Sequence, residues 1–291
     1  MSKNLANKNK FKQAFSLIEI SIVILILGIL IAGVTQSSIL FSKFQISNAR
    51  NLTTGSAVTR ISNLVTWYET TMENSFDDAE TEDNSTITNW YDLNPQSSYK
   101  NNASSSTAKP IYIKNCINNL PCLRFNGSND YMAFNGNIFI NSSYTIFIVE
   151  QRRSNKSANY IIGGTQGVVG KNLTFGYESN NLVRHSHYSV DTMDYAVSNY
   201  KSPTPIIHTV MFDKNAGRKY WLNGGVNPTA SDSGTTPLTS FTGSTIGRFN
   251  TYFFNGDVAE IIIYSDSLLN RDRQVIENYL SQKWKIAIAT S

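Results

Sequence analysis

The sequence carries little net charge, and this narrows the partners that the chain can recognise. Lys and Arg number 25 against 21 Asp and Glu, which gives a formal net charge of +4. The excess lies entirely in residues 1–14, which contain no acid and four lysines: Lys3, Lys8, Lys10 and Lys12. The rest of the chain is therefore close to neutral and lacks the clustered positive charge of a nucleic-acid-binding protein. We expect no nucleic-acid partner.

Motifs for common nucleotide and acyl-transfer sites are also lacking. No Ser-His-Asp set, phosphate loop or dinucleotide fingerprint stands out in the sequence. The segment GVVGK at residues 167–171 is too short for a phosphate loop, and no Ser or Thr follows its lysine. We expect no cofactor of these kinds.

Histidine is scarce, with 3 in the chain. His185 and His187 are two apart and would share one face of a strand. A metal there would need a further ligand, such as His208 or Asp191, and no third ligand has a fixed spacing to the pair. We expect surface histidines and no metal site.

Proline is absent from residues 15–65, and residues 15–34 are almost wholly apolar with one charge, at Glu19. About 20 apolar residues in a helix cover the ~30 Å hydrocarbon layer of a bilayer. A carboxylate within such a span costs roughly 2.5–3.5 kcal/mol, so it usually marks function. Apolar residues beyond the span keep a mostly helical spacing, which predicts one helix of roughly 50 residues.

The segment KQAFSLIEISIVILILGILIAG at residues 12–33 resembles the N-terminus of a type IV prepilin or pseudopilin. The resemblance implies that a prepilin peptidase cuts between Ala14 and Phe15 and methylates the new N-terminal Phe15. It also implies that Glu19 pairs with the N-terminal amine of a neighbouring pilin or pseudopilin subunit during assembly. The family usually has Gly where this chain has Ala14.

A secretory signal peptide and a plain membrane anchor are the alternatives for this segment. The apolar core of a signal peptide has about 7–15 residues, which is shorter than the span seen here. The signal-peptide alternative also gives Glu19 no role. The lysine-rich leader predicts a single-pass protein of the bacterial inner membrane, with its C-terminal part outside the cytoplasm and later on a pilus or the cell surface.

The chain has 2 cysteines, Cys116 and Cys122, in the segment CINNLPC. Zinc would need two more good ligands, and none lies nearby. The five intervening residues include Asn-Asn and Pro and can turn the chain back. Outside the cytoplasm disulfides form and persist, so we expect a Cys116–Cys122 disulfide rather than free thiols.

From residue 111 onward, short runs rich in β-branched and aromatic residues alternate with Gly, Asn, Ser and Pro. Ten or more such runs predict a β-sandwich or jelly roll, so the fold class is mainly β with a long N-terminal helix. The segment at residues 269–286 predicts a short C-terminal helix that Asn270 caps. The acidic stretch at residues 76–83 lacks the Gly of a calcium loop and predicts a solvated loop.

An ordered set of segments resembles a laminin G-like domain of the concanavalin A-like jelly-roll superfamily. The segments are LVTWYE at 64–69, WYDL at 90–93, NNLPCLRFNGSNDYMAF at 118–134, WLNGG at 221–225, and the stretch from IGRFN to KWKI at 246–286. The resemblance spans about residues 64–288. It implies three parts: a leader at 1–14, a pilin-type helix at 15–63 and a jelly-roll domain at 64–291.

Laminin G-like domains often bind glycans or proteins through rim loops, sometimes with calcium. The resemblance therefore implies a surface glycan or protein ligand, with Asn223, Asn250, Tyr252 and Phe253 as candidate contacts. Aromatic faces stack on sugar rings, and amides hydrogen-bond to hydroxyls. We expect no metal or other cofactor, with calcium left open.

Glucanases of the same superfamily use paired acids in the pattern Glu-x-Asp-x-x-Glu, which this sequence does not contain. Asp257 and Glu260 are three apart, and strand alternation predicts that they lie on opposite faces. We therefore expect a minor pilin or adhesin that is not an enzyme. The alternatives are a pseudopilin of a type II secretion system and a membrane-anchored carbohydrate-active protein.

Overall fold

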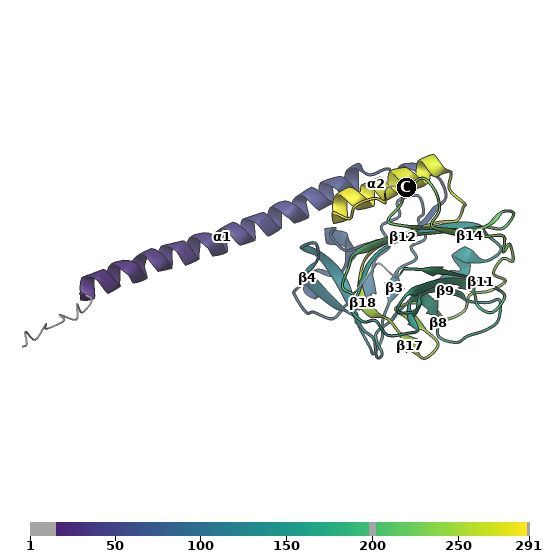
Figure 1. Cartoon of the computed structure of the whole chain (residues 1–291), viewed down its shortest axis with the longest axis horizontal. Coiled ribbons are helices and arrows are strands. Elements are labelled where there is room, and N and C mark those ends of the chain that lie inside the picture. The colour runs from purple at the N-terminus through teal and green to yellow at the C-terminus, as the bar shows by residue number, and fades with distance from the viewer. Residues whose placement is uncertain (1–15, 198–201, 290–291) are drawn as a thin grey trace, which may run out of the picture. The chain divides into compact units, whose positions relative to one another are not determined.

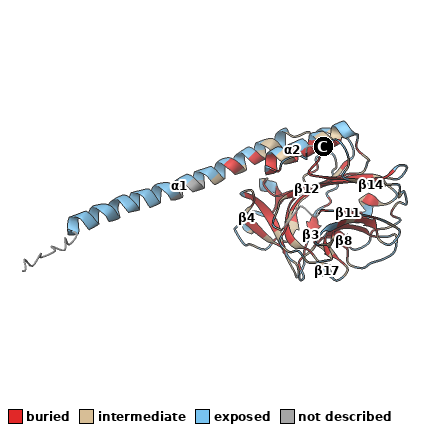
Figure 2. Cartoon of the chain, in the orientation of Figure 1, coloured by how far each residue is buried: buried red, intermediate tan, exposed pale blue. Residues whose placement is uncertain are grey.

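The computed structural model describes residues 16–197 and 202–289. The chain divides into two compact units, Met1–Phe44 and Gln45–Ser291. The first element is the helix α1 (Leu17–Gly55), drawn in purple and blue in Figure 1. Its segment Leu17–Val34 has a mean hydropathy of 2.9 and is exposed throughout, as Figure 2 shows. By length and composition this segment can cross a membrane.

The helix α1 ends at Gly55, so the expected continuation to about residue 63 is wrong. Gly is a poor helix former, and the hydroxyls of Thr53 and Thr54 donate to main-chain carbonyls one turn earlier, which weakens the last turn. A single 3₁₀ turn, η1 (Val58–Arg60), follows before the first strand.

Two antiparallel sheets form a β-sandwich from Gln45 onward, and both are visible in Figure 1. Sheet one has the order β14 (Ala230–Asp232), β13 (Gly217–Leu222), β12 (Ile206–Asp213), β7 (Tyr144–Arg152), β18 (Asn255–Tyr264), β5 (Leu120–Asn126) and β4 (Ile111–Ile117), and β1 (Leu64–Glu69) also pairs with β18. Sheet two has the order β11 (Asp191–Ala196), β10 (Leu182–His187), β9 (Leu173–Ser179), β8 (Asn159–Gly164), β15 (Ser244–Ile246), β6 (Met132–Ala133), β3 (Ala103–Ser104) and β2 (Asn89–Trp90).

The remaining elements are short, apart from one helix. A hairpin pairs β16 (Arg248–Phe249) with β17 (Tyr252–Phe253). Further 3₁₀ turns are η2 (Glu73–Ser75), η3 (Asp78–Glu80) and η4 (Gly136–Phe139). The helix α2 (Asn270–Trp284) packs on sheet one. Leu269 occupies its N-cap position without a side-chain cap, so the predicted capping by Asn270 is wrong.

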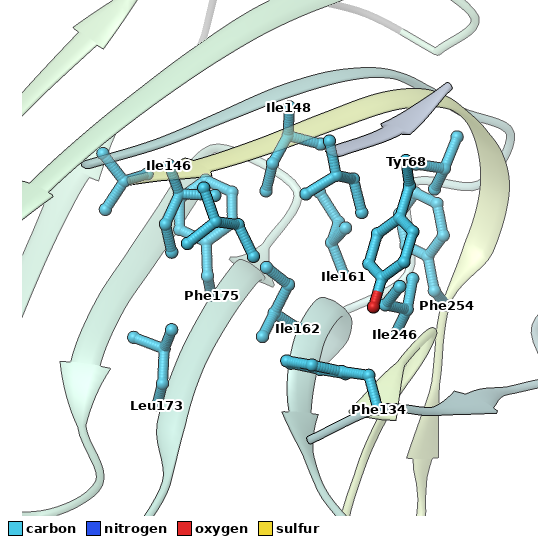
Figure 3. Close-up of a cluster of buried hydrophobic side chains, with 14 of the residues drawn as sticks. Tyr68, Phe134, Ile146, Ile148, Ile161, Ile162, Leu173, Phe175, Ile246 and Phe254 are labelled. Carbon is cyan, nitrogen blue, oxygen red and sulfur yellow. The ribbon is translucent and has the colours of Figure 1, made fainter. Parts of the chain in front are cut away.

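The main core lies between the two sheets, and Figure 3 shows part of it, with Tyr68, Ile148 and Phe175 among the labelled side chains. A second buried cluster covers the other face of sheet one, where the side chains of α2 pack. Strand β18 contributes to both, with Ile261 and Ile263 in the main core and Ile262 and Tyr264 in the second. This two-sided burial explains its unbroken apolar run. The mainly β sandwich with an N-terminal and a C-terminal helix confirms the predicted fold class.

Candidate functional site

The hairpin β16–β17 brings three of the four predicted ligand contacts together. Asn250 begins its turn with a φ of 54°, a left-handed conformation that Asn tolerates better than most residues. Its N–H donates to the carbonyl of Gly164 at 2.7 Å, which ties the turn to the end of β8. Tyr252 and Phe253 form the returning strand.

Close packing on β8 holds the hairpin in place. A Cβ on Gly163 would lie 2.5 Å from the Cβ of Phe249, so only glycine permits this approach. The Phe249 ring lies 5.3 Å from the Tyr160 ring and 5.0 Å from the Tyr188 ring, between centroids. The hairpin is therefore anchored by a buried aromatic side chain, while its outer residues remain accessible.

Arg248 is half-buried and begins the first strand of the hairpin. Its Nε donates to the carbonyl of Asn250 at 2.7 Å. Its guanidinium carbon lies 4.9 Å from the centroid of the Tyr131 ring and 5.2 Å from that of Phe253. We call these three residues, Tyr131, Arg248 and Phe253, the aromatic platform. Tyr252 pairs with Phe249 on the other face of the hairpin, where its ring lies 6.3 Å from the ring of Tyr160, and it is 47% exposed.

The fourth predicted contact, Asn223, lies elsewhere and is 6% exposed. Its side-chain oxygen accepts from the N–H of Ile207 at 2.9 Å, and its carbonyl accepts from Ala289 at 2.8 Å. It therefore holds the end of β13 to neighbouring main chain. The sequence analysis did not identify Arg248 or Tyr131 as candidate contacts. Both lie in segments that carried the jelly-roll resemblance, and Arg248 is two residues before the hairpin turn.

The histidines of β10 are buried, so the predicted surface location of His185 and His187 is wrong. Both Nε2 atoms contact the hydroxyl of Tyr144, at 2.7 and 2.8 Å. His187 Nδ1 lies 2.6 Å from the carbonyl of Thr236 and must donate to it, since a carbonyl only accepts. His187 Nε2 then accepts from Tyr144, whose oxygen accepts from His185 Nε2. The two imidazoles are thus fixed as neutral tautomers.

Burial lowers the pKa of both groups. It lowers the pKa of His187 to about 4, a shift that the hydrogen bond to Thr236 partly opposes. It lowers the pKa of His185 well below its usual range, and the nearby Arg218 lowers it further. His208 is not part of this group, because its ring pairs with Glu150 at 2.9 Å and with Tyr220 at 2.8 Å. Asp191 accepts the N–H of Thr236 at 2.9 Å.

Asp257 and Glu260 share the outer face of sheet one, so the prediction of opposite faces is wrong. A register shift between Val258 and Glu260 inserts an extra residue, which breaks the alternation. Asp257 accepts from Arg124 on the neighbouring strand at 2.7 and 3.1 Å. Burial raises the pKa of the Asp257 carboxyl, and Arg124 partly offsets this effect.

Glu260 belongs to a fully buried polar cluster under α2. Lys283 Nζ donates to Glu260 at 2.9 Å and also contacts a carboxylate oxygen of Glu69. Further donors to Glu260, each at 2.8 Å, are Trp67 Nε1, Tyr279 Oη and Trp284 Nε1. One buried ammonium group therefore faces two buried carboxylates, whose oxygens also accept hydrogen bonds from neutral donors, and these acids hold α2 to sheet one.

Cys116 and Cys122 form a disulfide, as predicted. Asp257 lies close to both sulfurs, and these three are the one set of potential metal ligands found within the described ranges. A disulfide offers no thiolate for a metal. The structure therefore assigns this cysteine pair to covalent cross-linking.

The predicted processing residues Ala14 and Phe15 lie outside the described residues. Glu19 lies in the first turn of α1, where its carboxylate accepts from the N–H of Ser16 at 2.8 Å. A carboxylate here satisfies a free N–H and complements the partial positive charge of the helix N-terminus. Its predicted assembly role concerns a contact between subunits and stays a prediction.

Comparison with known proteins identifies the N-terminal segment. Residues 9–35 match the family model described as the prokaryotic N-terminal methylation motif. No curated protein matches the sequence. The motif implies processing by a prepilin peptidase and association with the membrane or a pilus, as in type IV pilin-like proteins.

Several solved structures resemble the β-sandwich. A sialidase of Trypanosoma rangeli is 13% identical over 77% of this chain and 33% of its own, with a TM-score of 0.53. Botulinum neurotoxin type C is 15% identical over 77% of this chain and 53% of its own, with a TM-score of 0.55. The binding domain of botulinum neurotoxin serotype D/C is 14% identical over 75% of this chain and 52% of its own, with a TM-score of 0.51.

The chain thus spans about a third of the sialidase and about half of the neurotoxin chains. At these identities the likeness concerns the fold alone, a β-sandwich of two antiparallel sheets. The protein therefore combines a pilin-type N-terminal methylation motif with a β-sandwich that resembles those of the sialidase and the neurotoxins.

Proposed function

We propose that this protein is a minor pilin of the type IV class that displays its sandwich, a laminin G-like domain, on a surface fibre. The observation that carries the proposal is the methylation motif at residues 9–35, which contains the helical segment Leu17–Val34 that is long and apolar enough to span a membrane. Glu19 lies in the first turn of that helix, close to the expected new N-terminus at Phe15. In an assembled fibre its carboxylate would pair with the N-terminal amine of a neighbouring subunit.

The sandwich is the part that would be displayed, and we propose that it binds a glycan. The hairpin offers aromatic rings for contact with a sugar, the half-buried Phe253 of the platform and the exposed Tyr252 on its other face. The fold likeness agrees with this role, since uptake of botulinum neurotoxin type C into cells depends on interaction with two ganglioside molecules. Adhesion through the platform is therefore the proposed role of the domain.

We further propose that the domain binds its ligand without cleaving it. The buried acids on the outer face of sheet one are held in internal contacts, Asp257 with Arg124 and both Glu69 and Glu260 with Lys283. The full mature protein should therefore release no reducing ends from polysaccharides. Release that Glu260→Gln abolishes would overturn this part of the proposal.

Sheared surface fibres test the display role. The chain should be present in fibres from cells that have the prepilin peptidase, and confined to the membrane in cells that lack it. A type II secretion pseudopilin would instead remain in the cell envelope, and its loss would block secretion of hydrolases. Equal amounts of the chain in the fibre fraction with and without the peptidase would contradict the proposal.

A further inference from the structure

Arg248 is held rigidly without a carboxylate partner. Its Nε is fixed by the carbonyl of Asn250, and its guanidinium lies over the rings of Tyr131 and Phe253. These three contacts fix the plane of the guanidinium group, whose hydrogen-bond donors form a rigid fork, before any ligand arrives. The entropy cost of ordering a long side chain is thus already met in the free protein.

Three other arginines of the sandwich have their guanidinium groups paired with acids of the same chain. Arg124 pairs with Asp257, Arg218 with Asp232 and Arg273 with Glu277. Arg248 has no such ion pair among the described residues, and neither of its terminal nitrogens makes a hydrogen bond there. A terminal nitrogen without a hydrogen-bond partner is either buried and unsatisfied or in contact with solvent. The terminal nitrogens of Arg248 are not buried and unsatisfied, so they reach solvent. The fork is open on its outer side.

The acids near the platform are already engaged. Glu178 accepts from the Tyr160 hydroxyl and pairs with Arg184 at 2.8 Å. Asp130 accepts from the main-chain N–H of Asn126 at 3.0 Å. Neither Glu178 nor Asp130 is therefore free to form an ion pair with Arg248. An external anion would not have to displace either of them.

We infer that Arg248 binds the carboxylate of an acidic sugar in a ligand glycan, with the rings of Tyr131 and Phe253 beside the sugar. The planar guanidinium group matches a carboxylate with two parallel hydrogen bonds. The neighbouring aromatic rings favour a carboxylate carried by a sugar over a small free anion, because the sugar adds contact area with them. This inference rests on the proposed glycan-binding function and adds the charge class of the ligand.

The test uses the full mature protein in detergent and pairs of probes that differ mainly in charge. One pair is oligogalacturonate and its methyl ester, another is 3′-sialyllactose and lactose, and dextran sulfate serves as a sulfated probe. The protein should bind at least one carboxylated probe about tenfold to a hundredfold more tightly than its neutral partner, as loss of charge-assisted hydrogen bonds predicts. Rising salt should weaken this binding.

Substitutions locate the binding to the fork. Arg248→Gln should remove the preference for the carboxylated probe, and Arg248→Lys, which keeps the charge without the fork, should weaken binding about tenfold. Arg153→Gln is the matched control, because Arg153 is exposed on a neighbouring loop and its loss should leave affinity unchanged.

The outcomes separate this inference from the function on which it rests. Equal affinity for acidic and neutral sugars would overturn the inference and leave glycan binding in place. Unchanged affinity in Arg248→Gln, or binding of dextran sulfate alone, would equally overturn it. If no probe binds up to about 1 mM, the inference and glycan binding both fall, whereas recovery of the chain in sheared fibres would still support the display role.

Discussion

Lys283 and Glu260 form an ion pair of 2.9 Å with both side chains fully buried, between α2 and sheet one. Removing one partner leaves an uncompensated charge inside the protein. Lys283→Ala should therefore destabilise the domain by about 3–5 kcal/mol. Chemical unfolding measures this, with Lys219→Ala, at an exposed lysine of β13, as a control expected within about 0.5 kcal/mol of wild type. Equal stability of the two variants would remove the structural role of the pair.

The buried histidines predict a loss of stability in mild acid. Burial lowers the folded pKa of His187 to about 4, while the unfolded chain protonates near 6.5. The unfolded state therefore takes up the proton first, so stability is full above pH ~6.5 and is lost as pH falls towards ~4. The complete loss from this one group is roughly 3 kcal/mol.

Denaturant midpoints at several pH values measure this effect against His187→Gln, which cannot titrate. The comparison is needed because burial raises the carboxyl pKa values of Asp257 and Glu277, and these groups act in the opposite direction. Wild type should lose about 2 kcal/mol more than the variant between neutral pH and pH ~5. Parallel pH profiles for the two proteins would contradict the neutral, buried tautomers.

The Cys116–Cys122 disulfide closes a small loop and so constrains the unfolded chain only modestly. The double variant Cys116→Ala/Cys122→Ala should lose about 2 kcal/mol of stability. Adding a reductant to unfolded wild-type protein should produce the same loss and expose two thiols to labelling. Unfolding at an unchanged denaturant concentration after removal of both cysteines would show that the cross-link contributes nothing.

Glu19 is predicted to act in assembly rather than in folding of the sandwich. Glu19→Ala should sharply reduce the share of the chain found in sheared fibres while leaving the membrane-bound amount unchanged, because the charge pair between subunits is lost. Glu73→Ala is a matched control, since Glu73 is an exposed acid outside the span that pairs with Arg50. Normal fibre incorporation of Glu19→Ala would remove the assembly role.

Much of the sandwich follows from local sequence, because β-branched and aromatic runs between turn residues mark strands directly. The predicted strand LVTWYE is β1, Leu64–Glu69, and the predicted C-terminal helix is present as α2. It was harder to predict which face of each strand is buried. The spacing of His185 and His187 shows that they share a face, but local sequence does not say which face is buried.

Bulges and tertiary pairing account for the remaining errors. The β-bulge between Val258 and Glu260 places Glu260 on the same face as Asp257. The spacing of residues in the sequence does not indicate such a bulge. The aromatic platform depends on Tyr131 and Phe253, which are far apart in sequence and meet only through the fold. The sequence therefore indicated individual aromatic residues in loops. Only the three-dimensional structure shows that Arg248 packs against the rings of Tyr131 and Phe253.

The central claim is that this chain is processed as a type IV pilin, and the mass of its N-terminal peptide tests that claim most directly. The protein is extracted from membranes of cells with and without the prepilin peptidase, and the N-terminal peptide is identified by mass spectrometry. The account predicts an N-methylated Phe15 at the start in the first case and an uncut leader in the second. A leader that stays intact with the peptidase present, or a cut near residues 32–38, would contradict it and leave a plain anchor or a secreted β domain.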